Sequence, residues 1–334
     1  MLSLRENALA ILNGEQPDFY GDFMEALSWV PDPVRARDAI PQDGKEHKDS
    51  WGTVKVFLPD SPGAHPHITD ENVVIPDIEE WEKYLKVPQI EDLDWSKSRE
   101  VAAAIDRGQR FSAMFMAAGL FERSHFLMGM EDAFCNYLEY PEEMEELLSV
   151  IADFKIRQIE IAAEEFSPDV IFYQDDWGSK QNLFLPPDTW REIIKPIQMR
   201  ISKAIHDAGA LYVHHADCIC EPIVEDMIEL GVDIWQGVIP QNDIVAIQKK
   251  TAGKLPMIGG IDVPAIDLEG LDEEIIRGEV RRAIDTYCPA GKFFPGMPSG
   301  MCFVKRNDQI ARDELREYGR AWAEEHPIKQ APIA

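Results

Sequence analysis

The feature that most constrains the fold of this chain is an alternation of short apolar runs with longer amphipathic segments after residue 110. The runs are FSAMFMAAG, DVIFYQDD, ALYVHHAD, VDIWQG, LPMIGGID and KFFPGMP, and each ends in polar residues, glycine or proline. Short apolar runs of this kind are typical of strands that are buried on both faces of a sheet. The alternation therefore predicts repeated strand–helix–strand units.

The segments between these runs carry helical patterns. Residues 188–209 place one apolar stripe along a helix, formed by Trp190, Ile193, Ile194, Ile197, Ile201, Ala204 and Ile205. Gly209 follows where a helix would end, and residues 221–231 repeat the pattern in shorter form and also end on glycine. The fold class that fits best is α/β, with a single (β/α)8 TIM barrel and an elaborated N-terminal segment. A doubly wound open sheet is the alternative.

The chain is expected to form one domain over residues 1–334. Residues 1–110 are rich in proline and aspartate and weakly periodic, so they form the N-terminal elaboration, whereas residues 111–334 carry the regular repeats. Neither the GxGxxG dinucleotide fingerprint nor the GxxxxGK[ST] phosphate-binding loop occurs in the sequence. Nucleotide binding through either motif is therefore not expected.

The charge of the chain limits its partners. The sequence has 33 basic and 61 acidic residues and a formal net charge of −28 at pH 7. A surface this acidic repels nucleic acid and anionic membranes, so neither is an expected partner. The N-terminus lacks the long apolar segment of a signal peptide, and five scattered cysteines do not resemble a disulfide framework. We expect a cytoplasmic protein with reduced thiols, either a monomer or a homodimer.

The candidate site residues are those that follow the apolar runs, because the active site of such a barrel lies at the C-terminal ends of its strands. The candidate catalytic acids are Asp175, Asp176 and Asp217, and the candidate substrate-binding residues are Glu122, Arg123, Gln236 and Asp262. In VHHADCIC, residues 213–220, two histidines, an aspartate and two cysteines follow one strand, which points to a metal site. His214 points away from His215 along a strand, so we expect it behind the barrel.

Five blocks of the sequence resemble the uroporphyrinogen decarboxylase superfamily, in order and over nearly the whole chain. They are LRENALAILNGEQPD, DSWGT, GLFERSHFLMGMEDAFCNYLEYPEEMEELL, YQDDWGSKQNLFLPPDTWREIIKP and HDAGALYVHHADC with the following IVEDMIELGVDI. The decarboxylase of this superfamily grips the many carboxylates of a porphyrin with an arginine-rich N-terminal loop, because each carboxylate needs a cation. Here Arg35 and Arg37 lie in that region but the local balance is not basic.

The chain is more similar, in residues 209–234, to another branch of the superfamily, the corrinoid-dependent methyltransferases. Members of this branch hold zinc with a His-x-Cys pair after the corresponding strand and with a cysteine from a late loop. The resemblance places the histidine on His215, but the first cysteine position falls on Asp217 and the second on Met297. The usual ligand set is therefore not intact.

Three hypotheses about the metal follow from these departures. In the first, the loops shift and His215, Cys218 and Cys302 bind zinc. In the second, Asp217 replaces a thiolate and gives a harder His/Asp site. In the third, this chain has lost the metal, and Asp175, Asp176 or Asp217 acts as the proton donor.

The resemblance implies a methyltransferase of the O-demethylase type. Such an enzyme moves a methyl group between a small O-methylated donor, such as an aryl methyl ether, and the cobalt of a separate corrinoid-binding protein. Zinc or an active-site acid activates the leaving oxygen. The alternatives are transfer from a methylcorrinoid to a thiol, a metal-free decarboxylase with Arg123 or Lys180 beside the leaving carboxylate, and a non-catalytic binding barrel.

Overall fold

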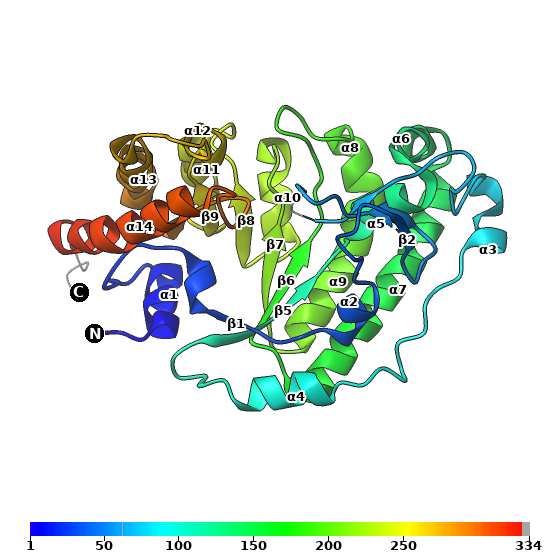
Figure 1. The fold of residues 1–334 in the computed structure, drawn as a ribbon, viewed down its shortest axis with the longest axis horizontal. Helices are drawn as coiled ribbons and strands as arrows, with labels where there is room; N and C mark the ends of the chain where they lie inside the picture. The colour runs from blue at the N-terminus through cyan, green and yellow to red at the C-terminus, as the bar shows by residue number, and fades with distance from the viewer. Residues whose placement is uncertain (62, 329–334) are drawn as a thin grey trace.

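A seven-stranded parallel sheet forms the centre of the structure, a computed structural model that describes residues 1–61 and 63–328. In sheet order the strands are β1 (Leu27–Trp29), β5 (Phe111–Met116), β6 (Val170–Gln174), β7 (Leu211–His215), β8 (Ile234–Val238), β9 (Met257–Gly260) and β10 (Phe293–Gly296). All six strands expected from the apolar runs are present. The α/β class is confirmed, since helices connect the parallel strands and flank the curled sheet (Figure 1).

Helices fill the connections between the strands. They are α1 (Leu4–Asn13), α2 (Pro33–Arg37), α3 (Trp81–Tyr84), α4 (Ser96–Ala103), α5 (Leu120–Met128), α6 (Met130–Glu139), α7 (Pro141–Phe166), α8 (Pro187–Thr189), α9 (Lys195–Asp207), α10 (Val224–Glu229), α11 (Ile244–Thr251), α12 (Val263–Ile266), α13 (Glu273–Tyr287) and α14 (Lys305–Glu325). In Figure 1, α7 and α9 lie on one side of the strands, and α13 and α14 lie on the other. No helix of the described residues is long and apolar enough to cross a bilayer.

The predicted helix over 188–209 contains one irregularity. A wide turn with π-helical bonding spans Trp190–Ile194, between α8 and α9. Pro196 follows one residue after this turn, and its nitrogen has no hydrogen to donate to the preceding turn. The apolar stripe is nevertheless buried as expected, with Ile194, Ile201 and Ile205 fully inaccessible to solvent.

The sheet contains seven hydrogen-bonded strands rather than the expected eight. Among the described residues no strand ladder joins β10 to β1. Side chains fill this gap: Phe23 packs between Phe111 and Phe294, with ring centroids 5.7 and 5.2 Å away, and Asp22 lies directly against Gly296. Aromatic packing thus takes the place of one strand pairing.

The N-terminal segment contains strands that the sequence did not reveal. Besides β1, a small antiparallel sheet is formed by β2 (Glu46–Lys48), β3 (Val54–Val56) and β4 (His65–Pro66). These strands have two or three residues each, which is too short for an alternating pattern to emerge. The turn between β2 and β3 is built by Asp49, whose carboxylate accepts the N–H groups of Trp51 and Thr53, both at 3.0 Å.

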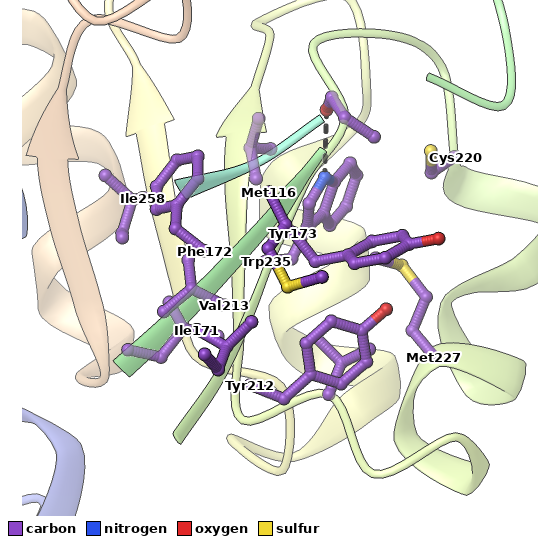
Figure 2. Packing of buried hydrophobic residues seen from close by; sticks show 14 of the residues in the cluster. Met116, Ile171, Phe172, Tyr173, Tyr212, Val213, Cys220, Met227, Trp235 and Ile258 are labelled. Carbon is purple, nitrogen blue, oxygen red and sulfur yellow. Dashed lines mark hydrogen bonds between the residues drawn. The ribbon is translucent and has the colours of Figure 1, made fainter. Parts of the chain in front are cut away.

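Alternation along the strands decides which side chains face the interior of the curled sheet. Figure 2 shows Phe172 and Tyr173 on opposite sides of β6. The same alternation sends His214 away from His215 as expected, and His214 is buried against Trp177 with ring centroids 3.9 Å apart.

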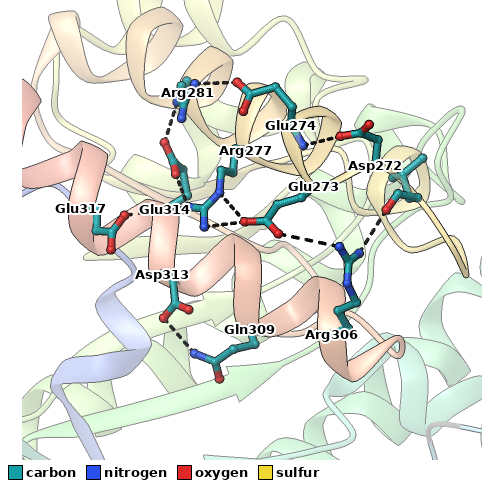
Figure 3. Close-up of polar contacts among 11 residues, drawn as sticks. Asp272, Glu273, Glu274, Arg277, Arg281, Arg306, Gln309, Asp313, Glu314 and Glu317 are labelled. Carbon is teal, nitrogen blue, oxygen red and sulfur yellow. Dashed lines mark hydrogen bonds and ion pairs between the residues drawn. The ribbon is translucent and has the colours of Figure 1, made fainter.

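The C-terminal helix is fixed to its neighbour by an ion-pair network (Figure 3). Arg277 and Arg281 of α13 both bind the buried carboxylate of Glu314 in α14. Further along α14, Gly319 packs against the N-terminal segment so closely that a Cβ atom there would lie 1.9 Å from the carbonyl oxygen of Tyr20. These contacts hold α14 beside the gap between β10 and β1, where it contributes to the cavity described below.

Candidate active site and metal site

The candidate site lies at the C-terminal ends of β6, β7 and β8. The strand register pairs Gln174 with His215 and His215 with Gln236, so these three side chains form a row across the sheet. Asp176 and Asp217 come two residues after Gln174 and His215, and therefore lie one step further on the same side. Parallel pairing thus brings together residues as far apart in the sequence as Gln174 and Gln236, as the barrel hypothesis requires.

Asp176, His215 and Asp217 form a group that can hold a metal ion. One ligand atom from each side chain lies within 4.8 Å of the other two, and all three residues are half-buried. The Asp176 carboxylate also accepts the backbone N–H of Asp217 at 2.9 Å, which fixes the two carboxylates relative to each other. A histidine with two carboxylates is a donor set that zinc accepts, and it leaves positions free for a substrate oxygen.

The orientation of His215 is set by a short hydrogen-bond chain. Gln236 Nε2 donates to the carbonyl oxygen of Pro298 at 2.9 Å, and a carbonyl can only accept, so the amide oxygen Oε1 faces His215. This oxygen contacts His215 Nδ1, which must then carry the hydrogen. Nε2 of His215 is left unprotonated in the neutral ring and is available as a ligand atom. Support of this kind usually accompanies a histidine that binds a metal.

The charges around this group favour a bound cation. Burial raises the pKa of Asp217, and the nearby Asp176 raises it further, while His215 and Lys180 act in the opposite direction. Two carboxylates held this close repel each other unless a proton or a metal ion lies between them. The residues present therefore fit a divalent metal ion with oxygen and nitrogen ligands, which corresponds to the second of the three hypotheses above.

Replacing Gln236 by alanine is expected to weaken metal binding by about 10–100-fold, because His215 loses the partner that fixes its ring. Competition with a fluorescent zinc chelator measures this change directly. Gln236→Glu is the matched variant, since a carboxylate still accepts the hydrogen of Nδ1, and it should retain most of the affinity. Equal metal affinity in the wild type and in Gln236→Ala would contradict the assigned role.

We expect Asp175 to stabilise the fold rather than to act on the substrate. Asp175 is fully buried and accepts the N–H groups of Phe121 and Glu122 at the start of α5, and Trp177 Nε1, at 2.9–3.1 Å. Burial raises its pKa to about 6, so it is largely ionised at neutral pH. Asp175→Ala should cost about 3 kcal/mol of unfolding free energy, because three buried donors lose their acceptor. Urea denaturation measures the cost, and unchanged stability would contradict it.

Glu122 lies behind the row of strand-end side chains. Gln174 Nε2 approaches its carboxylate at 3.4 Å, and burial raises the pKa of Glu122 well above its ordinary value, with further increases from Asp176 and Asp175. The carboxyl group of Glu122 is therefore biased toward its protonated form. It is not among the residues that line the cavity described below.

Arg123 takes a different place from the substrate-binding position that we expected. Its side chain is 5% exposed, and its guanidinium pairs with the buried carboxylate of Asp49 at 2.9 Å. It also lies over the ring of Trp51, 5.0 Å from the centroid. Arg123 does not line the cavity; instead it anchors the turn between β2 and β3 to α5. The Arg123 side chain points away from the cavity because this face of α5 packs against the N-terminal segment that carries Asp49 and Trp51.

The cysteines of the first metal hypothesis are not brought together with His215. The Cys218 thiol is buried and contacts Cys220 at 3.5 Å between sulfur atoms, and the Cys302 thiol is buried against the sulfur of Met297, also at 3.5 Å. The contact with Cys220 and burial raise the pKa of Cys218 well above its ordinary value, and burial raises that of Cys302 to about 12. Both effects disfavour the thiolate form that binds metals.

The loop that carries Cys218 and Cys220 is held by Asn242, which sequence reasoning missed. The Asn242 amide accepts the N–H of Cys220 at 3.1 Å and donates to the carbonyl oxygen of Cys218 at 3.0 Å. At the same turn Trp235 Nε1 donates to the carbonyl oxygen of Ala216 at 3.0 Å (Figure 2). No short motif marks a lone asparagine in this role, so the sequence offered no signal for it.

A large cavity opens above the strand ends, with a volume of about 1430 Å³. Among the predicted site residues, His215, Asp217, Gln236 and Asp262 line it. Sequence reasoning missed other lining residues, including Trp29, Arg35, Phe115 and Phe172. Phe115 and Phe172 lie inside runs that were treated as plain core, and Trp29 and Arg35 belong to the N-terminal segment, for which no strand was expected.

Comparison with known proteins gives a family and a fold. A family model described as uroporphyrinogen decarboxylase (URO-D) matches residues 62–296. The structure is similar to a solved methyltransferase from Methanosarcina mazei, with a TM-score of 0.65 over 95% of this chain and 99% of that chain, at 14% sequence identity. A likeness at this identity shows a shared fold. A search of the curated proteins found no match.

Proposed function

The chain belongs to the uroporphyrinogen decarboxylase family, and we propose that it is a methyltransferase whose substrate is a small O-methylated donor. The donor class we favour is the aryl methyl ethers, and the acceptor is the cobalt of a corrinoid held by a separate protein. The solved methyltransferase with the same fold supports the reaction type. The donor, the partner protein and the metal are parts of the proposal.

The observation that carries this proposal is the group of Asp176, His215 and Asp217, of which His215 and Asp217 line the large cavity. Zinc bound there would supply a Lewis acid for an ether oxygen. Carboxylate and imidazole ligands leave a metal more Lewis-acidic than thiolates do, which suits an oxygen leaving group better than thiol alkylation. The group therefore favours the donor side of the corrinoid over the thiol side.

Each residue of the site has a role in this reaction. Asp176, His215 and Asp217 hold the ligand atoms, and Gln236 keeps Nε2 of His215 free. The methyl–oxygen bond breaks, its electron pair stays on oxygen, and the methyl group passes to the cobalt of the acceptor. Lys180 lines the cavity beside Asp217 and supplies positive charge where the oxygen becomes negative.

The size of the cavity agrees with a reaction between two partners. A volume of about 1430 Å³ exceeds the roughly 300–1,000 Å³ that is usual for a small-molecule site. A small ether would fill only part of it. The remaining space would admit the reactive face of the corrinoid, whose protein docks transiently.

The proposal is tested by mixing the protein with a reduced corrinoid protein and a set of methoxyarenes without oxygen. Loss of the Co(I) absorbance together with release of the phenol is the expected result. The same reactions are assayed for carbon dioxide, the product that a decarboxylase would release. Carbon dioxide from a small acid without a corrinoid, and no phenol, would contradict methyl transfer and support the lyase alternative.

A further inference from the structure

One side of the cavity is an aromatic wall formed by Trp29, Phe115 and Phe172. The rings of Phe115 and Phe172 are 5.5 Å apart between centroids, and Trp29 meets them edge-on at 6.3 and 5.6 Å. The three residues come from the neighbouring strands β1, β5 and β6. Trp29 is 42% exposed, although its large indole would normally be buried. Phe172 is buried and Phe115 half-buried, so the accessible aromatic surface of this wall comes mainly from Trp29. An accessible aromatic ring in a cavity favours a flat aromatic ligand.

The aromatic wall connects the candidate metal site to a cation. At one end, the ring of Phe172 is stacked on the imidazole of His215 with centroids 5.9 Å apart. At the other end, the guanidinium carbon of Arg35 lies 4.6 Å above the centroid of Phe115. A ligand that lies along the wall with its methoxy group at His215 would thus extend toward Arg35.

Most of the basic side chains in the cavity already have partners. The five basic residues that line it are Arg35, Arg110, Lys180, Arg312 and Arg316. Arg110 donates to the carbonyl oxygen of Glu25 at 2.8 Å, Arg316 pairs with the Glu25 carboxylate at 3.0 Å, and Arg312 pairs with Asp308 at 2.8 Å. Within residues 1–61 and 63–328, Arg35 and Lys180 make no side-chain hydrogen bond or ion pair.

Arg35 is the better placed of these two cations for an anionic ligand. The charge of Lys180 acts on Asp217 and belongs to the surroundings of the candidate metal site. Two acids lie three residues from Arg35 in the sequence. Asp32 is buried and accepts from the backbone N–H of Val34 at 2.9 Å and from Gln158 at 2.7 Å; burial raises its pKa, and the charges of Lys155 and Arg35 lower it. Asp38 pairs with the neighbouring Arg37 at 3.4 Å. Arginine can stack on a ring while its planar fork binds a carboxylate, as its position over Phe115 would allow.

We propose that Arg35 binds an acidic group on the methyl donor, so that the preferred donors are O-methylated aromatic acids. The arene lies against the aromatic wall, the methoxy group points to the group around His215, and the carboxylate pairs with Arg35. This inference rests on the proposed methyl-transfer function, but it concerns binding and can be measured without a corrinoid.

The test compares the affinities of neutral and acidic ethers by isothermal titration calorimetry with the full-length protein. The probes are methoxybenzene, 4-methoxybenzoate and two homologues in which one or two carbons separate ring and carboxylate. At least one acid should bind about tenfold or more tightly than methoxybenzene, because a charge-assisted hydrogen bond is added. Arg35→Ala should remove this preference without weakening methoxybenzene, and Arg35→Lys should retain part of it.

Two variants serve as controls. Arg37→Ala changes the same short helix, but Arg37 binds Ser50 and the carbonyl oxygen of Gln89 instead of lining the cavity, so the preference for the acid should survive. Lys180→Ala should also keep it. Equal binding of acids and methoxybenzene by the wild type, a preference that survives Arg35→Ala, or its loss in Lys180→Ala would overturn the assignment.

The outcome for Arg35 is separable from the outcome for the proposed function. Methyl transfer at the same catalytic efficiency from methoxybenzene and from the acids would retain the function and overturn the Arg35 inference. Acid-selective binding that depends on Arg35, without methyl transfer to a reduced corrinoid protein, would support the Arg35 contact and contradict the function.

Discussion

Replacing His215 by alanine is expected to remove the bound metal and to lower the rate of methyl transfer by at least about a hundredfold. His215 is the nitrogen ligand of the candidate group, and the other two members are carboxylates that repel each other. Without the imidazole, the remaining ligand atoms are two weakly selective oxygen donors. Elemental mass spectrometry and the Co(I) absorbance assay measure the two effects on the same preparation.

The matched control for this variant is His206→Ala. His206 is exposed, pairs with Asp233 and does not line the cavity, so its loss should leave metal content and rate unchanged. Thermal denaturation of both variants shows whether either change acts through folding. A His215→Ala protein that keeps both its metal and its rate would contradict the assignment of the site.

Replacing Asp49 by alanine is expected to destabilise the protein by about 3–5 kcal/mol, the cost of leaving buried charges without their partner. The Asp49 side chain is fully buried and binds Arg123 at 2.9 Å and Lys55 at 3.1 Å, besides the two N–H groups of its own turn. Arg123 is itself 5% exposed, so water cannot replace the lost carboxylate. Urea denaturation gives the change in unfolding free energy.

The effect of Asp49→Ala should depend on pH in a defined direction. Burial alone would raise the pKa of Asp49, but the charges of Arg123 and Lys55 outweigh it and hold the pKa below its ordinary value. The folded state therefore binds the proton less readily than the unfolded state. The stabilisation is complete above about pH 4, the ordinary pKa of aspartate, and is lost as the pH falls through the lower folded value.

A control in the same segment shows whether the loss of stability comes from the buried Asp49–Arg123 pair or from the removal of any acidic side chain. Asp43 is exposed, and among residues 1–61 and 63–328 its side chain binds His47 and the backbone N–H of Lys45, so Asp43→Ala should leave the unfolding free energy unchanged. Asp49→Asn should lie between the wild type and Asp49→Ala, because an amide oxygen still accepts the N–H groups of Trp51 and Thr53. Equal stability of Asp49→Ala and the wild type would show that the turn does not depend on this pair.

The regular part of the fold was predictable because burial on both faces gives each strand a continuous apolar run. Residues 170–173 and 211–213 show this pattern, and both lie in strands whose central residues are buried. The N-terminal segment gave no such pattern. β1 has three residues, and its membership in the sheet is set by pairing with β5 and by the packing of Phe23, which are long-range effects.

The sequence placed the candidate site residues at the strand ends, but it did not predict which of their side chains lie together. Placement after strand ends identified Asp176, His215, Asp217 and Gln236, because parallel strands end at the same edge of the sheet. It could not separate Asp175 from Asp176, since the choice depends on which of two adjacent side chains turns toward α5. Cys218 was a candidate ligand because it lies three residues after His215. Asn242, however, hydrogen-bonds to the backbone of its loop, and the Cys218 thiol contacts Cys220.

Arg123 shows how burial changes the role of a residue that looks functional. A charged residue after a strand end is a fair substrate-binding candidate by position alone. The Asp-x-Trp-Gly turn that carries Asp49 lies more than 70 residues away in the sequence, and only the fold brings it against α5. The resemblance marked both segments, but it could not tell that they bind each other.

The measurement that tests the central claim most directly is the metal content of the purified protein and of four variants, determined by elemental mass spectrometry without chelators. The ligand assignment predicts about one zinc per chain in the wild type, Cys218→Ala and Cys302→Ala, and little or none in His215→Ala and Asp217→Ala. Zinc that is lost in the cysteine variants but retained in Asp217→Ala would contradict the assignment and restore the thiolate site.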